Sequence, residues 1–163
     1  MKNVLIVYHS TTGGTLQMAE AAAKGARREA GVTVRLQTAA ATGPQELLEA
    51  DGYLFACAEN LAAMSGVMKD FFDRTYYAVL DRIQGRAYAT LICAGSDGTN
   101  AARQIERIAT GWRLRDIAAP IIVCTHAQTA KEILRPKQIG AEDLARCEEL
   151  GTTLAAGLAL GIF

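Results

Sequence analysis

The chain has 163 residues, half of them apolar, and its 17 basic residues are balanced by 17 acidic ones. This length favours a single domain over residues 1–163, large enough to bury a substantial core. The composition excludes a disordered chain, and the neutral charge balance leaves no electrostatic signature of a nucleic-acid or anionic-membrane partner.

The first half of the chain alternates apolar runs with helical patterns. The continuous apolar run at 3–9 is typical of a strand covered on both faces, whereas 32–38 alternates like an edge strand. Gly31 is expected to end the first helix, and Pro44 favours the first turn of a short helix with Thr42 as its possible cap. In chain order the expected elements are strand 3–9, helix 15–29, strand 32–38, a short helix in 42–50 and strand 51–57.

The second half continues the same alternation of strands and helices. The segment 125–140 has the least regular pattern, and no repeat or flexible linker interrupts the chain. In chain order the expected elements are a loop at 57–65, helix 66–80, strand 86–95, helix 100–112, strand 119–126 and helix 141–160.

Five strands separated by helices predict a doubly wound α/β fold, with a parallel sheet between two layers of helices. The expected strand order, 2-1-3-4-5, would place the reversal of winding between the first and third strands. In such sheets a ligand binds beyond the carboxyl ends of the strands, where the winding reverses. The loops at 10–15, 57–65 and 95–98 are therefore the expected site.

The junction after the first strand reads Ser10-Thr11-Thr12-Gly13-Gly14-Thr15. A helix N-terminus carries unpaired N–H groups and a partial positive charge, so it binds anions without a basic side chain. Glycines let the backbone approach an anion closely, and the hydroxyl groups can donate to the same oxygens. The stretch predicts a phosphate site made of neutral donors, although hydroxyl residues that only cap the helix are the simpler alternative.

The sequence of this junction also indicates which kind of phosphate ligand it could bind. A triphosphate loop needs a Gly-Lys-Ser/Thr sequence, and no lysine occurs in this region before Lys24. The GxGxxG pattern of dinucleotide sites is also absent, because only Gly13 and Gly14 are present. A monophosphate is the ligand that these residues favour.

The hexapeptide Ser10–Thr15 resembles the phosphate signature of the flavodoxin superfamily, [TS]-x-T-G-x-T, at the same place after the first strand. Residues 64–75, Met-Ser-Gly followed by a helix, are similar to the segment after the second flavin loop in WrbA-like NAD(P)H-dependent FMN reductases. The resemblance implies a flavodoxin-like fold with noncovalent FMN. The residues that it assigns to the cofactor are Ser10, Thr11, Thr12, Gly13, Gly14, Thr15, Ala58, Glu59, Asn60, Leu61, Ala62, Met64, Ser65, Gly95, Ser96, Asp97 and Gly98.

Two departures from the flavodoxin pattern bear on activity. The second and third loops contain no Trp, Tyr or Phe to stack on the ring, so Leu61, Met64 or a partner subunit is expected to supply apolar contact. The chain is neutral, whereas single-electron flavodoxins are strongly acidic, because negative charge near the flavin lowers its potential. We therefore expect an oxidoreductase that passes electrons from NAD(P)H to a quinone or similar small molecule, with an electron-transfer flavodoxin or an FMN-binding regulatory module as the alternatives.

No side chain is expected to act as a catalytic acid or base, since the flavin supplies the chemistry. His9 and His126 are too far apart in sequence to indicate a metal site, and His9 could either assist the phosphate or only hydrogen-bond at the strand end. The resemblance to reductases implies a homodimer or larger assembly. The start of the chain lacks the pattern of a signal peptide, which favours a cytoplasmic location.

Overall fold

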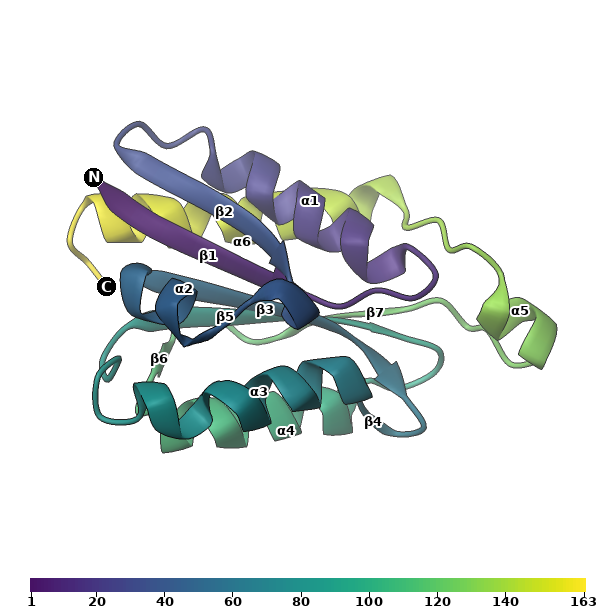
Figure 1. Cartoon of the computed structure of the whole chain (residues 1–163). Coiled ribbons are helices and arrows are strands. Elements are labelled where there is room, and N and C mark those ends of the chain that lie inside the picture. The colour runs from purple at the N-terminus through teal and green to yellow at the C-terminus, as the bar shows by residue number, and fades with distance from the viewer.

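A parallel sheet of order β2-β1-β3-β5, with β6 and β7 both beside β5, forms the centre of the computed structural model, which describes residues 1–163 (Figure 1). Its strands are β1 (Lys2–Tyr8), β2 (Val32–Thr38), β3 (Gly52–Asn60), β5 (Ala87–Ala94), β6 (Arg115–Asp116) and β7 (Ile121–Cys124). The order confirms the doubly wound fold expected from the sequence, with β6 and β7 in the place of the fifth strand.

Two helices cover each face of the sheet, which gives the three layers visible in Figure 1. The helices are α1 (Gly14–Ala26) and α6 (Ala141–Ala159) on one face, and α3 (Gly66–Val79) and α4 (Thr99–Gly111) on the other. The short helix α2 (Pro44–Glu49) follows a 3₁₀ turn (Ala39–Ala41) and packs near α3. None of these helices combines the length and the apolar character needed to cross a membrane.

The apolar run of β1 is explained by two cores, one on each side of the sheet. Val4 and Ile6 belong to the core beneath α1 and α6, whereas Leu5 and Val7 belong to the core beneath α3 and α4. All four side chains are buried because successive residues of a strand point to opposite faces. A strand covered on both faces has no solvent side on which a polar residue would be favoured.

The fifth strand differs from the single run expected at 119–126. Residues 115–116 and 121–124 pair separately with β5, and the ladder is interrupted after the N–H of Ile117, which donates to the Tyr88 carbonyl at 3.1 Å. Pro120 precedes the second segment and has no N–H to donate to a neighbouring strand. The short helix α2 also begins differently, because Gly43 is its N-cap and Thr42 instead donates its hydroxyl to the Thr38 carbonyl.

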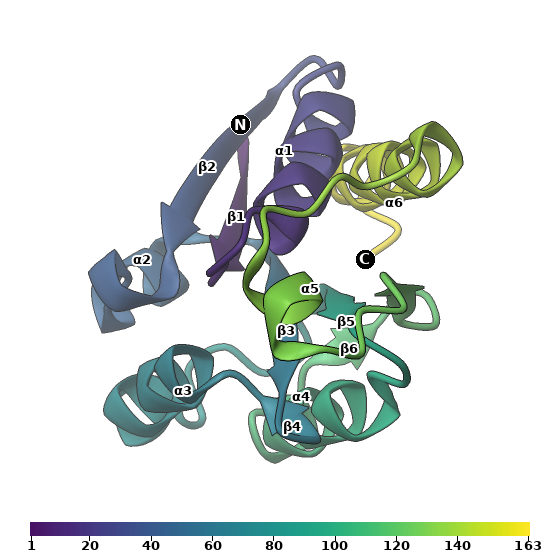
Figure 2. The same ribbon diagram turned by 90° about the vertical axis from the view of Figure 1, so that its right-hand side faces the viewer.

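Two expected loops contain regular structure at the carboxyl end of the sheet. Residues 57–65 continue β3 and turn back as β4 (Ala63–Met64), which pairs antiparallel with β3. The irregular segment 125–140 contains the short helix α5 (Ala130–Leu134). Figure 2, which views the carboxyl ends of the strands, shows α5 lying in front of the sheet between α1 and α4. The turn between β3 and β4 and the helix α5 both line a cavity at this edge of the sheet.

Candidate functional site

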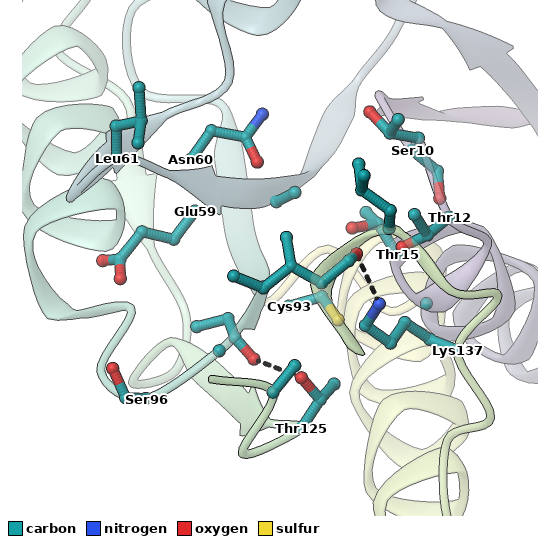
Figure 3. Close-up of a pocket in the computed structure, with 18 of the residues that line it drawn as sticks. Ser10, Thr12, Thr15, Glu59, Asn60, Leu61, Cys93, Ser96, Thr125 and Lys137 are labelled. Carbon is teal, nitrogen blue, oxygen red and sulfur yellow. Dashed lines mark hydrogen bonds between the residues drawn. The ribbon is translucent and has the colours of Figure 1, made fainter. Parts of the chain in front are cut away.

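A cavity of about 530 Å³ opens at the carboxyl ends of the strands, where the three expected loops meet. Figure 3 shows Ser10, Thr12 and Thr15 on one side of it and Glu59, Asn60 and Leu61 on the other. The lining residues are Ser10, Thr11, Thr12, Gly14, Thr15, Ala58, Glu59, Asn60, Leu61, Ala62, Cys93, Ala94, Gly95, Ser96, Thr125, Ala127, Gln128, Ile133, Leu134 and Lys137. The volume is in the range of pockets that hold a cofactor-sized ligand.

The β1–α1 loop forms one end of the cavity and carries an unpaired hydroxyl group. Gly13 is the N-cap of α1 with φ +91°, a conformation that favours glycine, and its N–H donates to Ser10 Oγ at 3.1 Å. Thr15 is only 2% exposed, and its Oγ1 has no hydrogen-bond partner. A buried polar group without a partner is costly, so an unmatched donor at this position indicates a ligand.

Neighbouring segments hold this loop in place. The Gln17 side chain donates to the carbonyl oxygens of Gly13 and Lys137 at 2.9 and 2.8 Å, and it accepts from the N–H of Ile139 at 3.0 Å. The backbone N–H of Lys137 donates to the Thr12 carbonyl at 2.8 Å. The segment before α6 is thereby bonded directly to the loop, which leaves the loop little freedom to change shape when a ligand enters.

One cationic side chain, Lys137, lines the cavity beside the loop, and no carboxylate pairs with it. The Lys137 ammonium group donates to the carbonyl oxygens of Glu132, Ile133 and Arg135, and Figure 3 shows one of these bonds. Burial lowers the pKa of His9, so its imidazole is neutral at pH 7, and Nδ1 lies 2.8 Å from Ser65 Oγ. Burial also raises the pKa of Cys93 to about 11, which keeps this thiol protonated. The direct hydrogen-bond donors that the loop offers to an anion are neutral N–H and O–H groups, and the nearby Lys137 charge adds attraction.

The β3–β4 turn forms the opposite end of the cavity. Leu61 and Ala62 have φ values of +49° and +63°, which are unusual for residues with a side chain. The turn is supported from α4, because Asn100 Nδ2 donates to the Ala62 carbonyl at 2.6 Å. Glu59 Oε2 is buried without a hydrogen-bond partner, and Glu59 lines the cavity. An unmatched acceptor therefore lies across the cavity from the unmatched Thr15 donor.

The Ala62→Gly variant tests the strain in this turn. A positive φ costs a residue with a Cβ about 1–2 kcal/mol, so we expect Ala62→Gly to raise the free energy of unfolding by up to about 1 kcal/mol. Urea unfolding of the two proteins measures the difference. Ala63→Gly, in the adjacent strand, is the control and is expected to lose about 0.5–1 kcal/mol. A loss of stability in both variants would contradict the strain.

The structure places twelve of the seventeen residues assigned from the sequence on the cavity wall and five outside it. Those outside are Gly13, Met64, Ser65, Asp97 and Gly98. Met64 in β4 and Ser65 at the start of α3 are buried, and Gly98 is the N-cap of α4 with φ +84°. Asp97 hydrogen-bonds Thr99 in the first turn of that helix. These four residues support the conformation of the second and third loops without lining the cavity.

Eight lining residues were not predicted from the sequence. They are Cys93, Ala94, Thr125, Ala127, Gln128, Ile133, Leu134 and Lys137. Six of them belong to the irregular segment 125–140, whose position beside the cavity depends on tertiary contacts with Gln17 and the β1–α1 loop. The only sequence signal for this segment is that it follows the fifth strand, whose carboxyl end reaches the same edge of the sheet. No cluster of three or more metal-ligating side chains is present.

The chain combines a doubly wound α/β fold with a loop of N–H and hydroxyl donors, without a basic residue, at the first strand–helix junction. This combination is typical of mononucleotide-binding proteins. The model of the flavodoxin family matches residues 6–111, and the chain belongs to this family. This confirms the superfamily predicted from the sequence. Membership implies an FMN-binding fold.

Individual relatives agree on the fold but differ in name. The Flavodoxin of Aquifex aeolicus is 34% identical over 98 residues, which are 60% of this chain and 53% of that protein. An NAD(P)H dehydrogenase (quinone) of Acidithiobacillus ferrooxidans is 34% identical over 95 residues, 46% of this chain and 48% of that protein. The chain spans about half the length of these relatives. The solved structure of a flavodoxin from the domain Archaea has a TM-score of 0.78 at 23% identity and covers 96% of this chain and 99% of that one.

The cavity fits the cofactor that the family implies. The β1–α1 loop offers hydroxyl groups and helix N-terminal N–H groups for one phosphate, and the buried Thr15 hydroxyl lacks any other partner. The rest of the lining includes the apolar side chains of Leu61, Ile133 and Leu134 and the polar side chains of Glu59 and Asn60. That combination suits a ring system with apolar faces and a polar edge.

Proposed function

We propose that the chain is an FMN-dependent oxidoreductase that passes electrons from NAD(P)H to a quinone or similar small acceptor. The observation that carries the proposal is the cavity of about 530 Å³. At the N-terminus of α1 it holds the buried Thr15 hydroxyl, which has no hydrogen-bond partner, and its other walls combine apolar and polar side chains. Bound FMN would supply the redox chemistry, accepting reducing equivalents from the nucleotide and releasing them to the acceptor.

The protein's own contribution is binding and orientation. Ser10, Thr12 and Thr15, with the N-terminal N–H groups of α1, would hold the phosphate, and the β3–β4 turn would border the ring. The Lys137 ammonium donates its hydrogen bonds to neutral carbonyl groups, so it would add long-range attraction for the phosphate rather than a direct hydrogen bond, and the neutral His9 ring would add no charge. No side chain in the cavity is assigned a catalytic proton transfer.

Two features favour turnover over simple electron carriage. The chain has no excess of negative charge, whereas a strongly reducing flavin is favoured by negative charge around it. One relative is named NAD(P)H dehydrogenase (quinone). The name of the other, Flavodoxin, favours the alternative, an electron-transfer protein without turnover, and an FMN-binding regulatory module is the third candidate.

We also propose that the protein forms a homodimer or larger assembly and is located in the cytoplasm.

An anaerobic titration of the FMN-loaded protein with NADH and NADPH separates these functions. For a reductase we expect the flavin absorbance near 450 nm to bleach with one of the nucleotides and to return when a quinone is added. For a carrier the nucleotide alone leaves the absorbance unchanged, although dithionite bleaches it. Protein that takes up no FMN would contradict both functions, and gel filtration of the same sample measures the assembly.

A further inference from the structure

The cavity is lined by no aromatic side chain but by three large, exposed aliphatic ones. None of the twenty lining residues is Trp, Tyr or Phe. Leu61 is fully exposed, Ile133 is 50% exposed and Leu134 is 72% exposed, and all three line the same cavity. Exposed aliphatic side chains from two separate elements around one cavity indicate a ligand with an apolar surface between them.

The helix α5 that carries Ile133 and Leu134 is held firmly although it is only five residues long. Thr129 Oγ1 accepts from the N–H of Glu132 at 3.2 Å, and the Glu132 carboxylate accepts from the N–H of Thr129 at 3.0 Å, which caps the start of the helix. The Lys137 ammonium donates to the carbonyl oxygens of Ile133 and Arg135, each at 2.7 Å, at its end.

The segment is also bonded to the site on both sides of α5. Upstream, the N–H groups of Thr125 and His126 donate to the carbonyl oxygens of Ala94 and Gly95 in the third loop, at 2.9 and 2.7 Å. Downstream, Lys137 is bonded to the β1–α1 loop through Thr12 and Gln17. A short surface helix fixed to two binding loops keeps its exposed aliphatic side chains at the cavity, at a solvation cost that a bound apolar surface would remove.

We propose that α5 is the apolar cover of the flavin ring. Ile133 and Leu134 pack against the isoalloxazine system, Leu61 contacts it from the β3–β4 turn, and these aliphatic groups take the place of stacking aromatic side chains. The inference rests on the proposed flavin site and adds a ring-binding element from the segment between the last strand and the last helix.

A tryptophan introduced on α5 tests this contact directly, because an indole in van der Waals contact with a flavin quenches flavin fluorescence by electron transfer. We expect FMN bound to Leu134→Trp to lose most of the fluorescence that the wild-type complex shows. Leu160→Trp is the matched control, since Leu160 is 75% exposed at the end of α6 and does not line the cavity. Equal fluorescence in the two tryptophan variants, with FMN bound to both, would overturn the proposal.

A second variant separates the cover from the phosphate loop. Replacing Ile133 and Leu134 together by serine is expected to weaken the binding of FMN, riboflavin and lumiflavin by a similar factor, about tenfold, because all three ligands share the ring. Unchanged affinity for lumiflavin would overturn the proposal. Failure of the wild-type protein to bind any of the three flavins would instead refute the flavin site and, with it, the cover.

Discussion

Replacing Thr15 by valine is expected to weaken FMN binding by roughly 10- to 100-fold while making the cofactor-free protein more stable. The two effects share one cause. Thr15 Oγ1 is buried without a hydrogen-bond partner, so the hydroxyl destabilises the empty protein and is available to a phosphate. Valine keeps the shape and removes the donor, which should add about 1 kcal/mol to the free energy of unfolding without FMN.

Flavin titrations and urea unfolding of the same samples measure the two effects. Riboflavin lacks the phosphate, so its affinity for Thr15→Val is expected to equal its affinity for the wild type. Thr153→Val, on an exposed position of α6, is the control and should change neither quantity. Equal losses for FMN and riboflavin would show that the substitution disturbs the cavity and would refute a phosphate contact. Lower stability of the empty variant would refute the unmatched hydroxyl.

The elements whose signals are local were predictable from the sequence. The run at 3–9 is apolar because β1 is buried on both faces, and the doubly wound parallel sheet followed from the alternation of strands and helices. The β1–α1 wall of the cavity was also predictable, since a left-handed glycine and hydroxyl groups at a strand–helix junction occur within six consecutive residues. Nothing distant in the chain is needed to form that turn.

The other wall of the cavity depends on contacts between distant residues and had no comparable signal. The position of α5 is set by Gln17, Lys137 and the third loop, which are far apart in the chain. The β3–β4 hairpin was expected to be a loop because its turn residues are Leu61 and Ala62, where a tight turn of this conformation normally has glycine or asparagine. Asn100 bonds to that turn from α4, a tertiary contact that local propensity does not report.

The largest loss of stability is expected for Gly151→Ala, because α1 and α6 are packed with their backbones in contact. A Cβ at position 151 would overlap the carbonyl oxygen of Ala22, and a Cβ at position 25 would overlap that of Glu148. Backbone atoms cannot rotate away, so the helices would have to separate and leave the core residues between them less well packed. Although alanine is the better helix former, we expect the free energy of unfolding to fall by about 3 kcal/mol.

Thermal and urea unfolding of the cofactor-free protein measure this loss, which corresponds to a decrease in Tm of about 6–12 °C for a chain of this size. Gly66→Ala is the matched control, since Gly66 is the first residue of α3 and a Cβ there would meet no atom within 4 Å. We expect the free energy of unfolding of this control to equal that of the wild type or to exceed it by up to about 1 kcal/mol.

Gly25→Ala should resemble Gly151→Ala, because it forces apart the same two helices from the other side. Since α1 begins at the phosphate loop, either variant that retains its fold should also bind FMN less tightly than Gly66→Ala, and wild-type stability in both would refute the backbone contact.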